Sequence, residues 1–362
     1  MTEREREIYQ LIEGNPMISQ SEIASMLDIT RTSVAVHISN LVKKGYIMGK
    51  GYIMAYTHPM TVIGGANVDI QGKPEGHLLM EDSNPGFIQT SLGGVGRNIA
   101  DNISKFNLDT RLITAIGDDK EGAMVKENAR DLAIDMDESI ISTENRTSTY
   151  LYVLDEHGEL VVAVSDMGIV ERLTPDYFKK LLTKIDHSPY TVIDANLPKN
   201  TIEYLAENLH STRLVLDPVS ITKAVRAKDV LGKFYAVKVN RTEAEALTGL
   251  SLDGQEAIQE AGQKLLEQGV KRVFITLGSQ GVYYQDSEQG FFREAIQTEV
   301  INATGAGDAF TAAMIYGFAE NLSNENLVDF CIGASTIALS DEKTIASDLT
   351  IETVNVILKN NL

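Results

Sequence analysis

Residues 61–362 alternate between two patterns of hydrophobic and polar positions. Short runs rich in β-branched residues recur, and several are apolar at every position, which is typical of strands buried on both faces. Between them, residues 201–209 and 254–268 carry apolar positions at helical spacing. This alternation predicts an α/β fold with a doubly wound, mostly parallel sheet. The predicted strands are residues 61–70, 111–117, 191–197, 213–219, 235–240 and 272–278.

One section departs from this alternation. Residues 148–154 (STYLYVL) and 159–164 (ELVVAV) are two strand-like runs, and Asp155-Glu156-His157-Gly158 separates them. Four polar or small residues between two such runs predict a β-hairpin. We expect this hairpin to stand apart from the main sheet as a small β-lid.

The beginning of the chain has a helical pattern. Ser19 and Glu22 have the spacing of a capping box, in which each side chain satisfies the other residue's exposed N–H. The next helical segment ends before Gly45, a natural helix stop. Its apolar positions form one stripe, which consists of Val34, Ile38, Leu41 and Val42.

A predicted hairpin follows these helices. Residues 46–54 (YIMGKGYIM) have the pattern of a strand, a Gly-rich turn and a second strand. Helices followed by a hairpin are the order of a winged helix-turn-helix. We therefore predict two domains, a winged helix-turn-helix over residues 1–58 and the α/β domain over residues 59–362.

In such a domain, the second helix of the paired helices enters the major groove of DNA with its N-terminal residues. The side chains that we expect at this interface are Arg31, Thr32, Ser33, His37 and, at the wing tip, Lys50. The chain has a net charge of −19, yet residues 1–60 are neutral, and no acidic residue lies between Ile29 and Val68. DNA is thus an expected partner of this segment alone. A helical protein-docking module is the alternative.

The composition of the chain bears on its compartment and on membrane association. Cys331 is the only cysteine of the 362 residues, which excludes an intramolecular disulfide and favours a reducing compartment. Residues 1–10 (MTEREREIYQ) lack the apolar core of a signal peptide. The most apolar stretch, residues 309–319, is shorter than the roughly 18 residues that a membrane span needs. We expect a cytoplasmic protein without a membrane partner.

Polar and Gly-rich stretches follow the predicted strands, which is where ligands bind in open α/β sheets. Asn67 and Asp69 share one face of an extended chain, and a carboxylate beside an amide suits a vicinal diol. A polar turn is the alternative. Gly93-Gly94-Val95-Gly96 precedes Asn98 at the start of a predicted helix. These glycines either let the backbone approach a ligand or form only a tight turn.

Two further stretches each have two interpretations. Asn240 and Glu243, three residues apart, share one helix face and suit Mg²⁺ held through its waters. They equally suit an N-cap and its capping partner. Residues 276–281 (TLGSQG) form a polar Gly turn after a strand. Such a turn either contacts nucleotide phosphates or serves as a loop.

The last stretch, Thr304-Gly305-Ala306-Gly307-Asp308, precedes an apolar helical segment. Backbone N–H groups without bulky side chains at a helix start form an anion hole. A carboxylate beside such a hole either caps the helix or serves phosphoryl transfer to an alcohol. In that reaction the base takes the hydroxyl proton, and the N–H groups stabilise charge on the transferred group.

Together, these five stretches resemble the ribokinase (PfkB-type) family of sugar and nucleoside kinases over roughly residues 61–350. The resemblance implies a ribokinase-like fold, ATP and Mg²⁺ as cofactors, and Asp308 as the catalytic base. It implies an anion hole at Gly305, Ala306 and Gly307, and contacts to substrate hydroxyls from Asn67, Asp69, Gly94 and Asn98. ATP contacts are implied for Asn240, Thr276, Gly278, Gly281 and Thr304, and Mg²⁺ contacts for Asn240 and Glu243.

Within the family, the chain resembles the bacterial pseudouridine kinases, which phosphorylate the ribose 5′-hydroxyl of pseudouridine. The resemblance implies lid segments at about residues 68–90 and 146–166, with Asp166 as a further substrate or lid contact. Family members often dimerise through the lid, so we expect a homodimer by analogy. The supporting stretches are DSNPG (82–86), GGVGRNIA (93–100), TSTYL (147–151), GELVVAVSDM (158–167), LDPVS (216–220) and NATGAGDA (302–309).

The chain also departs from the family pattern. Asn302 stands where many members have an aspartate near a monovalent-cation site, which argues against K⁺ activation. Lys238-Val239-Asn240 stands where pseudouridine kinases often have Lys-Pro-Asn. Most members lack the N-terminal DNA-binding segment.

Three functions remain open on the sequence. The first is a pseudouridine kinase fused to a DNA-binding domain. The second keeps the chemistry with another acceptor: ribose, another nucleoside or a hexose phosphate. The acidic body and the absence of an Arg/Lys cluster near the substrate motifs argue against phosphorylated sugars. The third is a transcription regulator that senses a nucleoside with little kinase activity, although Asp308, Asn240 and Glu243 are all present.

Overall fold

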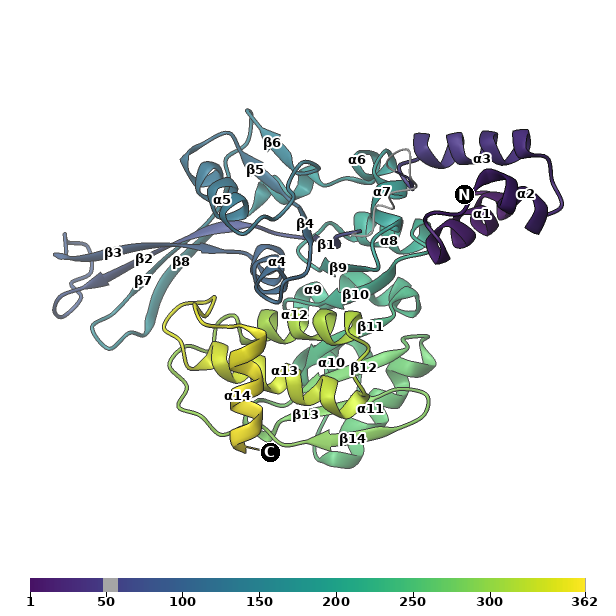
Figure 1. The fold of residues 1–362 in the computed structure, drawn as a ribbon. Coiled ribbons are helices and arrows are strands. Elements are labelled where there is room, and N and C mark those ends of the chain that lie inside the picture. The colour runs from purple at the N-terminus through teal and green to yellow at the C-terminus, as the bar shows by residue number, and fades with distance from the viewer. Residues whose placement is uncertain (48–57, 362) are drawn as a thin grey trace. The chain divides into compact units, whose positions relative to one another are not determined.

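The computed structural model describes residues 1–47 and 58–361 (Figure 1). The chain divides into two compact units, Met1–His58 and Pro59–Leu362. The described part of the first unit contains the helices α1 (Glu3–Gly14), α2 (Gln20–Met26) and α3 (Arg31–Lys43). Of the predicted wing, only Tyr46 and Ile47 belong to the described residues, so Lys50 lies outside them.

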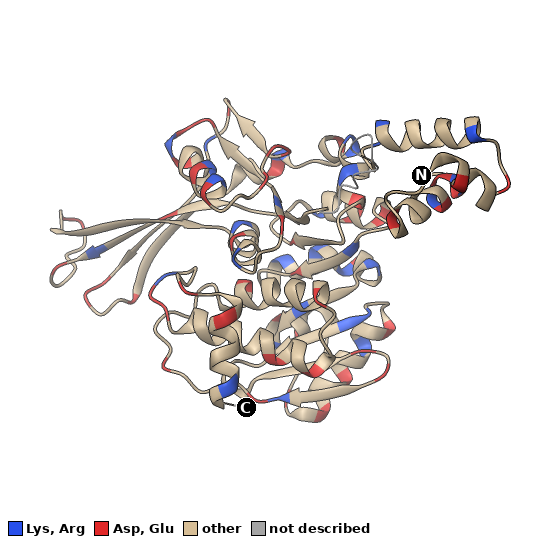
Figure 2. Ribbon diagram, in the orientation of Figure 1, with Lys and Arg blue, Asp and Glu red and all other residues tan. Residues whose placement is uncertain are grey.

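Local capping fixes the helices of the first unit. The predicted capping box is present: Ser19 Oγ accepts the N–H of Glu22, and Glu22 Oε2 accepts the N–H of Ser19. The basic residues of α3 stand at its two ends (Figure 2). Val42, predicted on the apolar stripe, is 44% exposed, because Leu41 takes the inward position and the next residue points about 100° away. The core consists of Ile8, Ile12, Ile18, Ile23, Ala24, Val34, Ile38, Leu41 and Ile47.

The second unit is built on an eight-stranded sheet. It is parallel from β4 to β12, and the β12–β13 and β13–β14 pairs are antiparallel. Its strands, in spatial order, are β14 (Gly290–Arg293), β13 (Val282–Gln285), β12 (Arg272–Thr276), β11 (Ala236–Asn240), β10 (Arg213–Asp217), β9 (Tyr190–Asp194), β1 (Met60–Ile63) and β4 (Thr110–Ile113).

Helices pack against both faces of this sheet, as the alternating pattern predicts, and each face has its own hydrophobic core. One face carries α4 (Val95–Lys105), α12 (Ala306–Ala319), α13 (Asn324–Leu339) and α14 (Ile351–Asn361). The other carries α6 (Pro175–Lys179), α7 (Leu182–Asp186), α8 (Lys199–Asn208), α9 (Ile221–Ala224), α10 (Arg241–Thr248) and α11 (Gln255–Glu267), with the short 3-10 helices η1 (Gly168–Arg172) and η2 (Val225–Lys233). No described helix combines the length and the apolar character needed to cross a membrane.

A second sheet of four strands forms the lid and extends away from the main sheet (Figure 1). The β2–β3 and β7–β8 pairs are antiparallel, and β2 pairs with β7 in parallel. Its order is β3 (Gly86–Gly93), β2 (Asn67–Pro74), β7 (Ser148–Leu154) and β8 (Leu160–Asp166). Beside it lie α5 (Lys120–Asp131) and the small β5 (Ala115–Gly117) and β6 (Ile140–Ser142) pair.

Two stretches predicted as single strands each break into two strands of different sheets. Residues 61–70 contribute β1 to the main sheet and then β2 to the lid, and residues 111–117 contribute β4 and then β5. The first break has a clear cause at Gly64, where a Cβ would overlap the carboxylate of Asp194. The next residue, Gly65, donates its N–H to Asp194 Oδ2 at 2.8 Å. Close backbone packing on this buried carboxylate turns the chain out of the sheet.

Candidate active site

The N-terminus of α12 is the centre of the candidate site. Its N-cap, Gly305, has a φ of +87°, and a Cβ there would overlap the carbonyl oxygen of Thr344. A Cβ on Gly307 would come within 3.0 Å of Lys238 Nζ. Residues without bulky side chains therefore fit both positions. The first-turn N–H groups and the helix dipole favour an anion at this end of α12.

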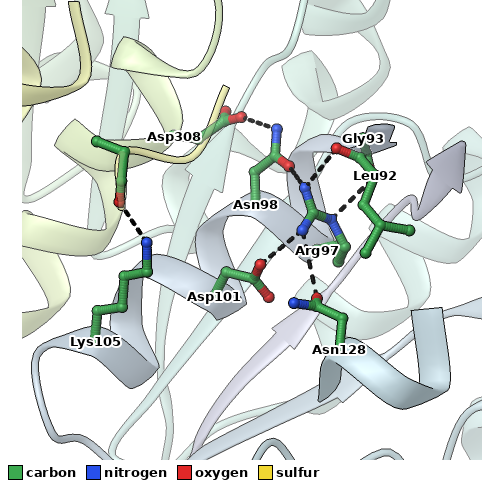
Figure 3. A network of polar contacts seen from close by, with 9 residues as sticks. Leu92, Gly93, Arg97, Asn98, Asp101, Lys105, Asn128 and Asp308 are labelled. Carbon is green, nitrogen blue, oxygen red and sulfur yellow. Dashed lines mark hydrogen bonds and ion pairs between the residues drawn. The ribbon is translucent and has the colours of Figure 1, made fainter. Parts of the chain in front are cut away.

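Asp308 lies in the first turn of α12 and is only 8% exposed. Its Oδ2 accepts a hydrogen bond from Asn98 Nδ2 at 2.7 Å (Figure 3). Burial raises the pKa of Asp308 to about 7; the carboxylate of Asp217 adds to this rise, and the ammonium of Lys238 opposes it. A carboxylate whose pKa lies near neutrality is suited to general-base catalysis.

A buried ion pair beneath Asp308 was not anticipated as part of the site. Lys238 Nζ on β11 lies 2.9 Å from Asp217 Oδ2 at the end of β10. Thr311 on α12 donates its hydroxyl to the same carboxylate oxygen at 2.8 Å. The sequence held a signal: Lys238 is the one charged residue in the apolar run YAVKVN (235–240). The neighbouring parallel strands β10 and β11 bring this pair close to Asp308 at the start of α12.

One cavity, of about 380 Å³, opens on the α12 start at Ala306 and Gly307. The predicted ATP-contact residues Thr276, Gly278 and Gly281 line it together. Most of the remaining wall is apolar, and includes Val282, Ala295, Ile296, Val300, Phe310, Ile332 and Leu339. An apolar wall suits the faces of a nucleotide base, and the helix N-terminus suits its phosphates. The residues present therefore fit ATP.

A second cavity, of about 700 Å³, opens on the same turn at Thr304, Gly305 and Asp308. It brings together four of the predicted substrate-binding residues: Asn67, Asp69, Gly94 and Asn98. Thr304, predicted as an ATP contact, thus lines this cavity and not the one that carries Thr276, Gly278 and Gly281. Asn240, the remaining predicted ATP contact, lines neither of the two. Asp166 is exposed at the end of β8, and its neighbours Ser165 and Met167 line the cavity in its place.

Asn67 and Asp69 form a fixed pair at the start of β2. Asn67 Nδ2 donates to Asp69 Oδ1 at 2.6 Å, and burial raises the pKa of Asp69. Gly93, opposite Asn67 in the β2–β3 pairing, has no room for a side chain, since a Cβ there would overlap the carboxylate of Asp69. The glycine at this position lets the lid strand approach Asn67 and Asp69 closely.

Several polar residues of the second cavity were not predicted, among them Ser148, Lys223 and Arg226. Ser148, on β7, is 1% exposed, and its Oγ has no hydrogen-bond partner among the described residues. Lys223 donates to Asn196 Oδ1 at 2.6 Å, and Arg226 Nη1 donates to the carbonyl oxygens of residues 195, 196 and 197. The cavity therefore holds two basic side chains, although no Arg/Lys cluster stands near the substrate motifs in the sequence. Lys223 and Arg226 lie far from the substrate motifs in sequence and reach the cavity only through the fold.

Asn240 and Glu243 form a capping box at the start of α10. Asn240 Oδ1 accepts the N–H of Glu243, and Glu243 Oε2 accepts the N–H of Asn240, both at 2.9 Å. Within residues 1–47 and 58–361, no group of three or more His, Cys, Asp or Glu side chains could hold a metal ion. Mg²⁺ that arrives with a nucleotide needs only one or two carboxylates beside phosphates and water. Glu243, which is buried, fits such an indirect role.

The predicted DNA-binding residues lie at the start of α3. Arg31 and Thr32 are exposed, and Ser33 and His37 are half-buried. Thr30 Oγ1 accepts the N–H of Ser33 at 3.2 Å, which fixes the start of the helix. This helix end, with Arg31 and few competing charges, suits contact with phosphate oxygens.

Both parts of the chain match known protein families. Residues 58–351 match the family described as pfkB family carbohydrate kinase, and residues 1–48 match winged helix-turn-helix DNA-binding. The chain is 33% identical to the uncharacterized sugar kinase YeiI of Escherichia coli (strain K12) over 340 residues, which cover 93% of this chain and 94% of YeiI.

Two further proteins extend this similarity. The pseudouridine kinase of Escherichia coli (strain K12) is 34% identical over 302 residues, which cover 83% of this chain and 96% of that protein. The structure of a carbohydrate kinase from Agrobacterium tumefaciens aligns with a TM-score of 0.75 at 27% identity, over 83% of this chain and 97% of the other. The chain therefore belongs to the pfkB family of carbohydrate kinases: it is a phosphotransferase with an alcohol group as acceptor, and it carries an N-terminal winged helix-turn-helix domain.

Proposed function

We propose that this kinase transfers the γ-phosphoryl group of ATP to the 5′-hydroxyl of a ribonucleoside, with pseudouridine as the first choice. One observation carries the proposal: the two cavities meet at the first turn of α12, and Asp308 faces the second one. A donor in the first cavity and an acceptor in the second place the reacting atoms on either side of this turn. In-line transfer between two bound substrates needs such an arrangement.

The chain's own residues have separate roles in this proposal. Asn67 and Asp69 bind the 2′- and 3′-hydroxyls of the ribose, which leaves the 5′-hydroxyl to face Asp308. Asp308 accepts the proton of that hydroxyl as its oxygen bonds to phosphorus and the bond to ADP breaks. The N–H groups of Gly305, Ala306 and Gly307 stabilise charge on the transferred group. Mg²⁺ supplies charge neutralisation at the ATP phosphates, and Glu243 and Asn240 would hold it through its waters.

Similarity supports pseudouridine as the acceptor. The 34% identity covers almost the whole length of a relative that is named a pseudouridine kinase. The cavity adds a chemical reason, because the buried Ser148 hydroxyl offers a hydrogen bond to a polar group of the acceptor. Lys223 and Arg226 keep phosphorylated sugars among the acceptors to be tested, since both line the same cavity.

ADP release with ATP and Mg²⁺ tests the proposal on a panel of pseudouridine, uridine, cytidine, adenosine, ribose and fructose 6-phosphate. We expect the highest kcat/KM for pseudouridine. A higher value for another acceptor would keep the kinase mechanism and reject pseudouridine. Nucleoside binding without turnover on any acceptor would instead favour the nucleoside-sensing regulator.

A second function, DNA binding by the first unit, is favoured by Arg31 and Thr32, which are exposed at the start of α3. We expect Arg31→Ala to weaken binding to operator DNA and to reduce its salt dependence, because one phosphate contact is lost. Arg4→Ala is the matched control, since Arg4 is exposed in the same unit and pairs with Glu7. Equal DNA binding by both variants would favour a protein-docking role for this unit.

A further inference from the structure

Arg97, on α4, is a buried arginine that the proposed mechanism does not use. It is 3% exposed, and all three of its guanidinium nitrogens donate hydrogen bonds (Figure 3). Nη1 donates to Asp101 Oδ2 at 2.6 Å, Nε to the Gly93 carbonyl oxygen at 3.1 Å, and Nη2 to the Leu92 carbonyl oxygen at 2.9 Å. The planar group is therefore held on three sides.

The same Nη2 also donates to Asn98 Oδ1. A side-chain amide has one acceptor oxygen and one donor nitrogen, so fixing the oxygen fixes the direction of the nitrogen. With Oδ1 bound by Arg97, Nδ2 points at Asp308 and donates to its Oδ2 at 2.7 Å. Rotation of the amide by 180° would set Oδ1 against the carboxylate and Nδ2 against the guanidinium, and both contacts would be repulsive.

We propose that Arg97 is a positioning residue for phosphoryl transfer, which acts through the Asn98 amide to orient the Asp308 carboxylate and to favour its ionised form. The inference rests on the proposed role of Asp308 as the base. Arg97 also holds the backbone of Leu92 and Gly93, the last residues of lid strand β3. The guanidinium thus joins the lid strand to the base through a single side chain, Asn98.

The charges around Asp308 determine how its pKa would change if the hydrogen bonds from Arg97 to Asn98 and from Asn98 to Asp308 were lost. Asp194 on β9 and Asp217 on β10 disfavour the ionised carboxylate, whereas Lys238 on β11 favours it. From α4, Asn98 favours the anion by its hydrogen bond, and Arg97 attracts Asp308 by its charge. Arg97 in turn faces Asp69 and Asp101. A misoriented Asn98 would remove the donor of one hydrogen bond to the anion, and the pKa of Asp308 would rise further.

The test is the pH dependence of kcat/KM for the best acceptor of the panel. Arg97→Lys keeps the cation but loses the planar fork that holds Asn98. We expect the acid limb of its profile to move up by about one pH unit, with activity largely recovered at high pH and the KM for ATP unchanged. Arg111→Lys is the matched control, because Arg111 is also buried, pairs with Asp135 at 2.9 Å, and lines neither cavity.

A double-mutant cycle with Asn98→Ala separates positioning from a structural role. If Arg97 acts through Asn98, Arg97→Lys will shift the profile of the wild type and not that of Asn98→Ala. A shift that persists without Asn98, or an unshifted profile, would overturn the inference. If Arg97→Lys does not fold, Asp101→Asn loosens the same guanidinium and should shift the profile in the same direction by less. Wild-type turnover in Asp308→Asn would mean that the base assignment, and not the Arg97 link, has failed.

Discussion

The two cavities that meet at the start of α12 are lined by different kinds of chemical groups. The cavity at Ala306 and Gly307 has mainly apolar walls and opens on the backbone N–H groups of a helix start, which suit phosphate oxygens. The cavity at Asp308 is lined by carboxylates, amides, hydroxyls and two cations. In our proposal ATP binds the first cavity, here called the donor cavity, and the nucleoside binds the second, the acceptor cavity. On that proposal, donor recognition depends on the main chain and on burial, whereas acceptor choice depends on individual side chains. Substitutions should therefore affect the two substrates separately.

The largest expected effect is at the turn that both cavities share. Asp308→Asn removes the base and keeps the shape, so we expect kcat to fall by about 10²–10⁴-fold while both substrates still bind. Steady-state kinetics and calorimetric binding measure these two quantities. A variant with near wild-type kcat would contradict the base role of Asp308.

A smaller effect, confined to the acceptor, is expected at Asp69. Asp69→Asn loses a charged acceptor for two hydroxyls, and we expect kcat/KM for the nucleoside to fall by about 10–100-fold with the KM for ATP unchanged. Asp118→Asn, at an exposed carboxylate outside both cavities, is the control. Equal losses for both substrates would break the distinction between the cavities.

The pH dependence of kcat/KM should reflect the protonation of Asp308 directly. Because its pKa is raised to about 7, kcat/KM should fall about tenfold per pH unit below pH 7 and reach a plateau above pH 8. The folded state holds this proton in the window between about pH 4 and 7, in which the unfolded chain has released it. The free energy of unfolding should therefore fall as pH rises through that window, and less so in Asp308→Asn. Thermal melts of both proteins at pH 5 and pH 8 test the sign.

The smallest expected effects come from two substitutions, one in each cavity, and each should affect only the substrate of its own cavity. Ser148→Ala removes the buried hydroxyl of the acceptor cavity, and we expect the nucleoside KM to rise by about 2–10-fold with no change for ATP. Thr276→Val, in the donor cavity, should raise the KM for ATP to a similar extent and leave the nucleoside KM unchanged. Crossed effects, with each variant altering the other substrate, would show that the two cavities are not independent.

Sequence reasoning predicted the fold class and the α12 turn because both follow from local patterns. The apolar runs gave the parallel strands of the main sheet, and the family resemblance pointed to Asp308 beside small residues at a helix start. The strand prediction was wrong at residues 61–70 and 111–117, where each predicted strand is two strands in different sheets. An apolar run does not reveal in which sheet each of its halves pairs. The Asn240–Glu243 spacing allowed either a cap or a metal contact, and the structure has the capping box.

What the sequence determined by itself is local: the capped start of α2, the small residues at the start of α12, and a carboxylate in its first turn. Only the tertiary structure decided which side chains surround that carboxylate. Asn98 and Asp308 are 210 residues apart, and Ser148, Lys223 and Arg226 reach the acceptor cavity from separate elements. Local conformation depends on neighbouring residues, whereas a buried polar cluster depends on how strands and helices pack, which no short stretch of sequence encodes.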